Sequence, residues 1–226
     1  VREAAERLSY VPNAQAQALA RSSAGLMGLI VHDIADPYFS AMAKGAQRVL
    51  SEAGVQLMLA TTDRNPEVEL KAVQTFMSYR TDGIILTGSR GFGGEDDLVR
   101  TLDSDRNLGG RVAMVGQPLA GFSGVQVANR EGAEGLAGEL VRLGYRNFTV
   151  LAGPRRLVTS SDRVEGFRQR IASAGIPDPR IVEGAFTRDG GYVMMADLIG
   201  SDERFRSGDL PVSERPCVFC VNDVMA

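Results

Sequence analysis

Residues that could carry out catalysis are few in this chain and stand apart from one another. His32 is the only histidine, and no second histidine and no cluster of cysteines or carboxylates joins it at the spacing of a metal site. The stretch GFSG at 121–124 is not the G-x-S-x-G of a nucleophile elbow. We therefore predict no catalytic residue, no metal ion and no cofactor, and we do not expect an enzyme.

A C-x-x-C pair, Cys217 and Cys220, could be a redox centre or half of a zinc site. The surrounding residues PCVFCVN instead indicate a buried strand, on which residues three apart point to opposite faces. Their Cα atoms would then lie about 10 Å apart, beyond the roughly 7 Å limit for a disulfide. We interpret both as unreactive reduced thiols, which fits a cytoplasmic protein.

The glycine-rich stretch GSRGFGG at 88–94 invites a phosphate-binding interpretation. It lacks the spacing of a dinucleotide fingerprint or a Walker loop, and the acidic residues EDD follow at once. Carboxylates at the start of a helix satisfy the helix dipole themselves and repel phosphate. We therefore interpret this stretch as a mobile loop.

Strand and helix patterns alternate along most of the chain. Short apolar runs bounded by glycine or aspartate indicate buried strands, and apolar residues at 3.6 spacing indicate helices. The predicted strands are 26–32, 55–61, 84–88, 111–115, 125–127, 148–153, 180–184 and 217–221, and the predicted helices are 39–53, 66–80, 95–106, 130–143, 162–174 and 189–199. This alternation predicts an α/β protein with parallel sheets. The glycine-rich connection 116–124 would join two similar subdomains.

Candidate binding residues follow the predicted strands, because ligands of open α/β sheets bind beyond the carboxyl ends of the strands. Eight polar or aromatic side chains hold such positions: His32, Asp36, Tyr38, Asp63 and Thr87 in the first subdomain, and Arg163, Phe186 and Asn222 in the second. Arg163 is the strongest candidate, because its rigid fork of donors suits hydroxyls, carboxylates or phosphates. An ion pair with Asp162 or Glu165 is its structural alternative.

The other candidates also have structural alternatives. Asn222 can donate to and accept from a sugar hydroxyl, or it can cap a helix that starts at Asp223. Tyr38 and Phe186 can stack on a flat ligand face, or they can be ordinary core aromatics. His32, as a lone histidine at a strand end, suits the polar wall of a binding cleft better than catalysis.

The first residues form a separate feature, YVPNAQAQALARSSAG at 10–25. Pro12 followed by Asn13, a good N-cap, predicts a helix of about two turns. Leu19 is its only large apolar residue, and helices shorter than about 12–15 residues are marginal in water. This helix is therefore not expected to stand alone, and a flexible linker is the alternative.

The composition describes an ordinary packed protein. The chain has 226 residues, 44% of them hydrophobic, and a net charge of −3, which argues against a surface coated all over with nucleic acid. No run of about 18 apolar residues predicts a membrane span, and the start lacks a signal-peptide pattern. The chain begins with Val and ends on NDVMA, which resembles the opening of a helix, so we expect a sequence cut at both ends.

Six segments occur in a characteristic order and spacing: REAAERLSYVPNAQAQAL, GLIVHDIADPYFSAMAKGAQ, TDGIILTG, SSDRVEGFRQRIASAGI, VEGAFTRDGGY and FCVNDVMA. Through them the chain resembles the LacI/GalR family of bacterial transcription regulators along essentially its whole length. The resemblance implies the end of a helix-turn-helix domain at 1–12, a hinge helix and linker at 13–24, an N-terminal core subdomain at 25–120 and an incomplete C-terminal core subdomain at 121–226. Both subdomains would be Rossmann-like, as in periplasmic sugar-binding proteins.

The resemblance also implies roles for the first helix. Leu19 would be the wedge that enters the minor groove at a central base step and bends the duplex. Asn13 and Ala14, with Tyr10, would contact the groove, and folding of the marginal helix would be coupled to operator binding. Gln17 replaces the usual basic residue and Ser9 the usual glycine, which weakens the expected phosphate contact but not the role.

The function implied is a ligand-responsive, sequence-specific DNA-binding regulator, with repression as the favoured mode. Its partners would be operator DNA, a second copy of the chain and a small-molecule effector between the subdomains, in the cytoplasm and away from membranes. A sugar or related metabolite is the favoured effector, and a purine is the alternative. A solute-binding protein for sugar transport is the alternative function, and an enzyme acting on a sugar or nucleotide ranks third.

Overall fold

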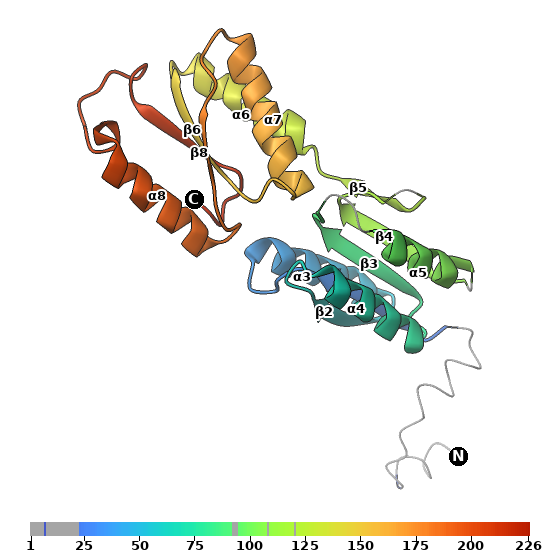
Figure 1. The fold of residues 1–226 in the computed structure, drawn as a ribbon. Coiled ribbons are helices and arrows are strands. Elements are labelled where there is room, and N and C mark those ends of the chain that lie inside the picture. The colour runs from blue at the N-terminus through green and yellow to red at the C-terminus, as the bar shows by residue number, and fades with distance from the viewer. Residues whose placement is uncertain (1–6, 8–22, 92–94, 108, 120) are drawn as a thin grey trace. The chain divides into compact units, whose positions relative to one another are not determined.

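The computed structural model describes residue 7 and residues 23–91, 95–107, 109–119 and 121–226. The residues predicted to contact DNA, which are Tyr10, Asn13, Ala14 and Leu19, lie outside the described residues. Residues 92–94 of the predicted loop at 88–94 also lie outside them. The described chain forms two compact units (Figure 1). The first contains the described residues up to Gly88 and from 95 to 126, and the second contains 89–91 and Val127–Ala226.

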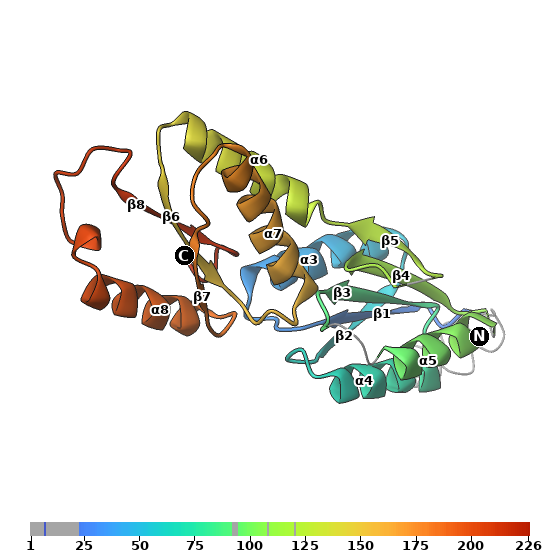
Figure 2. The same cartoon turned by 45° about the horizontal axis from the view of Figure 1, so that its top comes forward.

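The first unit is a parallel sheet with helices on both faces (Figure 2). Its elements are β1 (Leu26–Val31), α3 (Pro37–Glu52), β2 (Gln56–Thr61), α4 (Pro66–Ser78), β3 (Gly83–Gly88), α5 (Asp96–Asn107), β4 (Arg111–Gly116) and β5 (Ser123–Gln126). The strand order is β2-β1-β3-β4-β5, and every neighbouring pair is parallel. The carboxyl ends of β1, β2 and β3 therefore lie along one edge of the sheet.

Alternation along β1 divides the core of this unit between the two faces. Ile30 packs with buried residues of α4 and α5, whereas Leu29 and Val31 pack with Phe39 of α3. These four side chains are at most 3% exposed. Successive side chains of a strand point to opposite faces, so a strand that is covered on both faces needs a continuous apolar run.

The second unit has a smaller parallel sheet of order β7-β6-β8 in the described residues. Its elements are α6 (Asn129–Arg142), β6 (Asn147–Ala152), α7 (Val158–Ser173), β7 (Arg180–Glu183), α8 (Arg188–Ser201), the 3-10 helix η1 (Glu203–Phe205) and β8 (Pro216–Cys220). In Figure 1, α6 and α7 cover one face of this sheet and α8 covers the other. Phe167 of α7 stacks on Phe219 of β8, with 4.4 Å between the ring centroids, which anchors α7 on the sheet.

The predicted α/β class with parallel sheets is confirmed, but two predicted boundaries need correction. The strand predicted at 125–127 was expected to open the second subdomain after residue 120. It is β5, which pairs with β4 and completes the first sheet, so the units divide after Gln126. Helix α7 begins at Val158 rather than at residue 162.

Cys217 and Cys220 both lie on β8, as the sequence predicts, and both are partly buried. Burial raises the pKa of each thiol above its ordinary value. A raised pKa keeps the sulfur protonated at neutral pH, and the thiol is a much weaker nucleophile than the thiolate. This agrees with the interpretation of the pair as unreactive.

Candidate functional site

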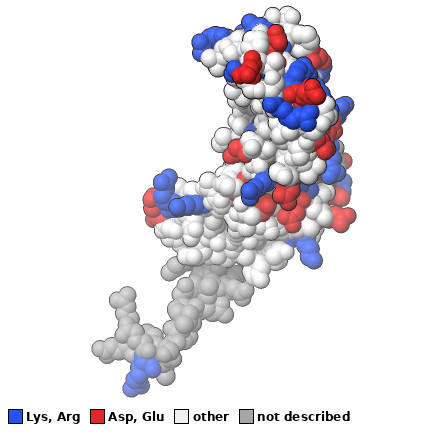
Figure 3. All heavy atoms as spheres, turned by 90° about the vertical axis from the view of Figure 1, so that its left-hand side faces the viewer, with Lys and Arg blue, Asp and Glu red and all other residues white. Residues whose placement is uncertain are grey.

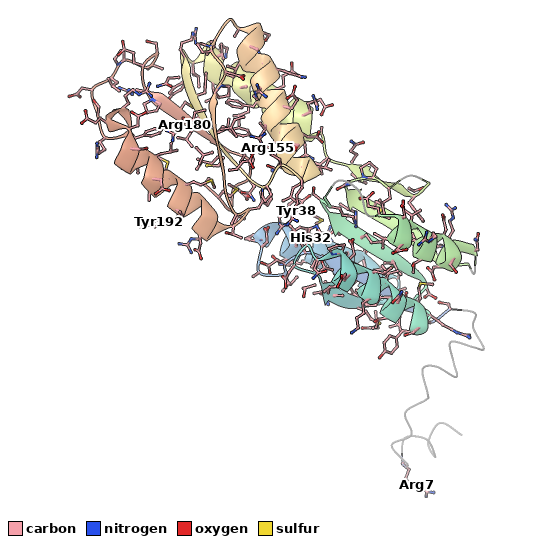
Figure 4. The ribbon with its side chains drawn as sticks, in the orientation of Figure 1. Arg7, His32, Tyr38, Arg155, Arg180 and Tyr192 are labelled. Carbon is pink, nitrogen blue, oxygen red and sulfur yellow. The ribbon has the colours of Figure 1, made fainter. Side chains whose placement is uncertain are left out.

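His32 directly follows β1 and is buried in the first unit (Figure 4). It is 3% exposed. Its Nδ1 lies 3.1 Å from Oγ1 of Thr62, and its ring meets Phe39 edge-on at 5.4 Å between centroids. A Cβ on Gly88 would come within 2.5 Å of the imidazole, so the glycine at the end of β3 leaves the space that this ring occupies.

Asp36 and Tyr38 shape the start of α3. The Oδ1 atom of Asp36 accepts a hydrogen bond from the Tyr38 amide at 2.9 Å, so Asp36 is the N-cap of this helix. The Tyr38 ring meets Phe39 edge-on but remains 44% exposed. Its exposure distinguishes Tyr38 from a core aromatic and leaves ring surface for stacking.

Thr87, near the end of β3, has a structural hydrogen bond. It is 1% exposed, and its hydroxyl donates to the carbonyl oxygen of Ile30 at 3.0 Å. This bond ties β3 to β1 near the carboxyl edge of the sheet. The sequence predicted the position of Thr87 at the strand end but not this bond.

The turn after β2 places the side chain of Arg64 near several carboxylates. Asp63 and Arg64 both have left-handed backbones, with φ of 47° and 60°, and the Asp63 amide donates to the His32 carbonyl at 2.8 Å. Burial lowers the pKa of Arg64, while the charges of Asp36, Asp33 and Asp63 raise it. The sequence analysis missed Arg64; its place directly after Asp63 at a strand end was the available signal.

Arg163 of the second unit is held by two acceptors from other elements. Its Nε donates to Oδ1 of Asn129, at the start of α6, at 2.9 Å. Its Nη1 donates to the carbonyl oxygen of Val221, just after β8, at 2.5 Å. Asp162, one of the two acidic residues considered as alternative ion-pair partners of Arg163, lies 3.6 Å from Arg130. Arg163 therefore lies half-buried at the carboxyl end of β8.

Asn222 and Phe186 lie at the same edge of the second unit. Asn222 Oδ1 accepts from the amide of Met225 at 3.0 Å, so the alternative interpretation as a cap is supported, although a turn rather than a helix follows it. Phe186 follows β7 and is partly buried against the core of the unit. A Cβ on Gly153, after β6, would come within 2.2 Å of its ring.

The start of α7 is capped by a segment from far away in the sequence. Its N-cap residue, Leu157, supplies no side-chain hydrogen bond. Instead, Ser89 Oγ accepts from the Thr159 amide at 3.1 Å, and the Arg90 carbonyl accepts from the Val158 amide at 3.4 Å. Two backbone donors that a helix start leaves unsatisfied are thereby paired. Arg163 lies on this same helix.

The structure thus gathers the eight predicted residues into two sets, one in each unit. His32, Asp36, Tyr38, Asp63 and Thr87 lie at one edge of the first sheet, joined by Arg64. Arg163, Phe186 and Asn222 lie at one edge of the second sheet. Within the described ranges, no group of three or more histidine, cysteine or carboxylate side chains could hold a metal ion. Both sets offer hydrogen-bond donors and acceptors beside an aromatic ring, which suits binding of a polar small molecule.

None of the helices in the described parts of the chain has both the length and the apolar character needed to cross a bilayer. Residues 24–206 match the model of the family described as periplasmic binding proteins and sugar-binding domain of LacI family.

Curated relatives match the chain over nearly its whole length. The HTH-type transcriptional regulator GalR of Escherichia coli is 28% identical and matches 100% of this chain and 62% of its own length. The HTH-type transcriptional regulator CelR of Thermobifida fusca is 29% identical and matches 93% of this chain and 64% of its own length. The chain therefore spans less than two thirds of the length of these relatives.

Solved structures share the fold. A complex of the regulator CelR with cellobiose has a TM-score of 0.69 at 26% identity and covers 99% of this chain and 64% of its own. The Cra regulator of Pseudomonas putida, solved with fructose 1-phosphate, has a TM-score of 0.73 at 24% identity and covers 89% of this chain and 70% of its own.

Proposed function

Because the chain belongs to the family of periplasmic binding proteins and LacI-type sugar-binding domains, we propose that it is the core of a sugar-responsive DNA-binding transcription regulator. Repression is the favoured mode. The two units bind the effector, and the residues before them contact the operator. A regulator of this kind acts in the cytoplasm, where the DNA is.

One observation favours regulation over solute transport. The family includes both kinds of protein, and its model begins at residue 24. The match to GalR covers 100% of this chain, so residues before 24 also align with a transcription regulator. A transport protein has no need of a DNA-contacting segment there. The same relatives are named as regulators rather than enzymes, which supports a non-enzymatic role.

The effector that we propose is a sugar or related metabolite. Arg163 and Asn222 in the second unit and Asp36 and Asp63 in the first supply donors and acceptors for hydroxyl groups. Tyr38 and Phe186 supply ring faces against which a pyranose or a purine could stack, so a purine stays the alternative. The related regulator CelR was solved with cellobiose, a sugar, and Cra with fructose 1-phosphate, a sugar phosphate.

The operator contacts that we propose come from Leu19, with Asn13, Ala14 and Tyr10 beside it. On the face shown in Figure 3, basic and acidic side chains of the described residues are intermixed rather than gathered by sign. Such a surface gives little non-specific attraction to phosphates. We propose that DNA affinity depends on the N-terminal segment and that effector binding changes it by altering the spacing of the two hinge helices. DNA must in turn change effector affinity by the same factor.

A homodimer follows from the two half-sites of a palindromic operator. Exposed apolar side chains are available for self-association: Tyr192 and Val193 of α8 are 76% and 57% exposed, and Val49 of α3 is 61% exposed. Tyr192 is labelled in Figure 4, where it points away from the helix. A full-length protein that sediments as a monomer at micromolar concentration would contradict the dimer.

Operator binding by the full-length protein tests this function. The probe is a palindromic fragment from its own promoter, and the variants are Leu19→Ala and, as a matched control, Leu143→Ala, an exposed leucine of the second unit. We expect tight, specific binding by the wild type and the control, and a sharp loss in Leu19→Ala, because the wedge stabilises the bent duplex. Weak, salt-sensitive and sequence-blind binding by the wild type would overturn the proposal.

A further inference from the structure

The guanidinium of Arg163 is oriented by contacts within the second unit. Nε and Nη1 donate to acceptors on two different elements, Asn129 of α6 and the carbonyl of Val221 after β8. A guanidinium is planar, so two hydrogen bonds from different nitrogens fix both its position and its plane. Asn129 must present its carbonyl oxygen rather than its amide nitrogen, because Nε can only donate.

The backbone of α6 approaches α7 very closely one turn further along. A Cβ on Gly166 would come within 2.1 Å of the Arg130 carbonyl oxygen and 2.8 Å of the carbonyl carbon. Residues three apart lie on the same face of a helix, so Arg163 and Gly166 face the same turn of α6. The glycine therefore sets the separation at which the Asn129 side chain can reach Arg163.

The hydrogen bond from Arg163 to the Val221 carbonyl also connects Arg163 to Asn222, a second candidate binding residue. The Val221 carbonyl that Arg163 holds belongs to the residue directly before Asn222, and Asn222 in turn accepts from the Met225 amide. The backbone at the carboxyl end of β8 is thus tied to α7 through Arg163. A shift of the guanidinium would be transmitted to Asn222 through one peptide unit.

We propose that Asn129 and Gly166 are positioning residues for ligand recognition by Arg163. Neither contacts the ligand: Asn129 fixes the guanidinium plane, and Gly166 allows α6 to come close enough for Asn129 to do so. The ligand then meets an arginine whose rotamers are already restricted, which lowers the entropic cost of binding. The part of this proposal that concerns the ligand rests on the proposed function; the part that concerns the guanidinium does not.

The first measurement needs no ligand. Hydrogen exchange at the Arg163 Nε–H, followed by NMR in the whole chain, reports whether the proton is hydrogen-bonded. We expect at least about tenfold faster exchange in Asn129→Ala, and near wild-type protection in Asn129→Asp, because a carboxylate oxygen also accepts. Asn147→Ala is the control, since the side chain of Asn147 donates to the Glu214 carbonyl, away from Arg163. Unchanged exchange in Asn129→Ala would overturn the positioning role.

The second measurement is calorimetric titration with cellobiose and, separately, with fructose 1-phosphate. For whichever probe the wild type binds, we expect about tenfold weaker binding in Asn129→Ala and in Gly166→Ala, and recovery in Asn129→Asp. Faster exchange of the Nε–H with unchanged affinity would show a merely structural bond and overturn the proposal. If the wild type binds neither probe, the sugar-effector function fails for these ligands, and the exchange measurement judges the positioning of Arg163 alone.

Discussion

Asp105 of α5 occupies the space beside Gly110. A Cβ on Gly110 would come within 2.0 Å of the Asp105 Oδ2 atom, and the Gly110 amide donates to the Asp105 backbone carbonyl at 3.0 Å. The Oδ2 atom is buried and has no hydrogen-bond partner among the residues that the structure describes. Its carboxylate also lies in the last turn of a helix, where negative charge is unfavourable.

Burial raises the pKa of Asp105 above its ordinary value. The folded state therefore binds the Asp105 proton more tightly than the unfolded state does. Its free energy of unfolding falls as the pH rises above the ordinary carboxyl pKa of about 3.9. We therefore expect Asp105→Asn to stabilise the protein at pH 7 and to have a smaller effect at pH 4. Urea unfolding at several pH values measures the difference, and a pH-independent difference would contradict this account.

Asp202 is a control for this prediction, because its pKa is shifted in the opposite direction. Its hydrogen bonds with Arg204 lower the pKa of Asp202 to about 2. A lowered pKa contributes stability above the unfolded value, and this stability is lost as pH falls toward the folded value. The effect of Asp202→Asn should therefore be destabilising at pH 7 and should fade on acidification, opposite in sign to that of Asp105→Asn.

Ser89→Ala should destabilise the second unit. The change removes the acceptor of the Thr159 amide at the start of α7, and loss of a helix cap costs about 1 kcal/mol. Ser78→Ala is the control, because that hydroxyl donates to the Thr75 carbonyl on an exposed helix end and caps no backbone amide among the described residues. Denaturant unfolding measures both. Equal stabilities of the two variants would mean that α7 does not depend on Ser89.

Gly166→Ala should destabilise the protein by about 1–3 kcal/mol, because the new methyl group would overlap the backbone of Arg130. Gly135→Ala is the matched control on α6. No atom of the described residues lies within 4 Å of a Cβ at Gly135, so alanine there should stabilise by about 0.5–1 kcal/mol through its higher helix propensity. Thermal unfolding compares the pair, and the same sign for both variants would contradict the close approach of the helices.

Arg80→Gly should stabilise the first unit. Arg80 follows the end of α4 with a left-handed backbone, φ 53°, which suits glycine and strains other residues. We expect a gain of about 0.5–1 kcal/mol. Arg48→Gly, in the middle of α3, should instead cost about 1 kcal/mol. Urea denaturation resolves both changes, and a loss of stability in Arg80→Gly would show that the arginine side chain has a role that outweighs the strain.

Periodicity predicted the alternation of the fold because covered strands and amphipathic helices differ in their apolar pattern. At β5 it predicted a strand but gave it the wrong bounds and the wrong subdomain, since the four residues of this strand are all exposed and carry no apolar pattern. It also placed the start of α7 too late. Leu157 is not a capping residue, and the cap comes from Ser89, which no local pattern around 157 can reveal.

The rule that ligands bind beyond the carboxyl ends of parallel strands predicted which residues lie at the carboxyl edges of the two sheets. It did not predict the hydrogen bonds that hold their side chains. The Thr87 hydroxyl and the Asn222 side-chain oxygen both have backbone partners, which depend on register and turn geometry. Asn129 was not predicted, because its partner Arg163 is 34 positions away. Arg64 was missed because charged residues in turns are usually solvated, whereas this one is partly buried among carboxylates.

The second unit is not one continuous stretch of chain, because residues 89–91 belong to it while the described residues up to Gly88 and from 95 to 126 belong to the first unit. A chimera that joins two family members at the single junction after Gln126 would combine the α7 of one parent with the capping loop of the other. Recombination among such proteins is therefore expected to succeed more often when two crossover points transfer the loop together with α7.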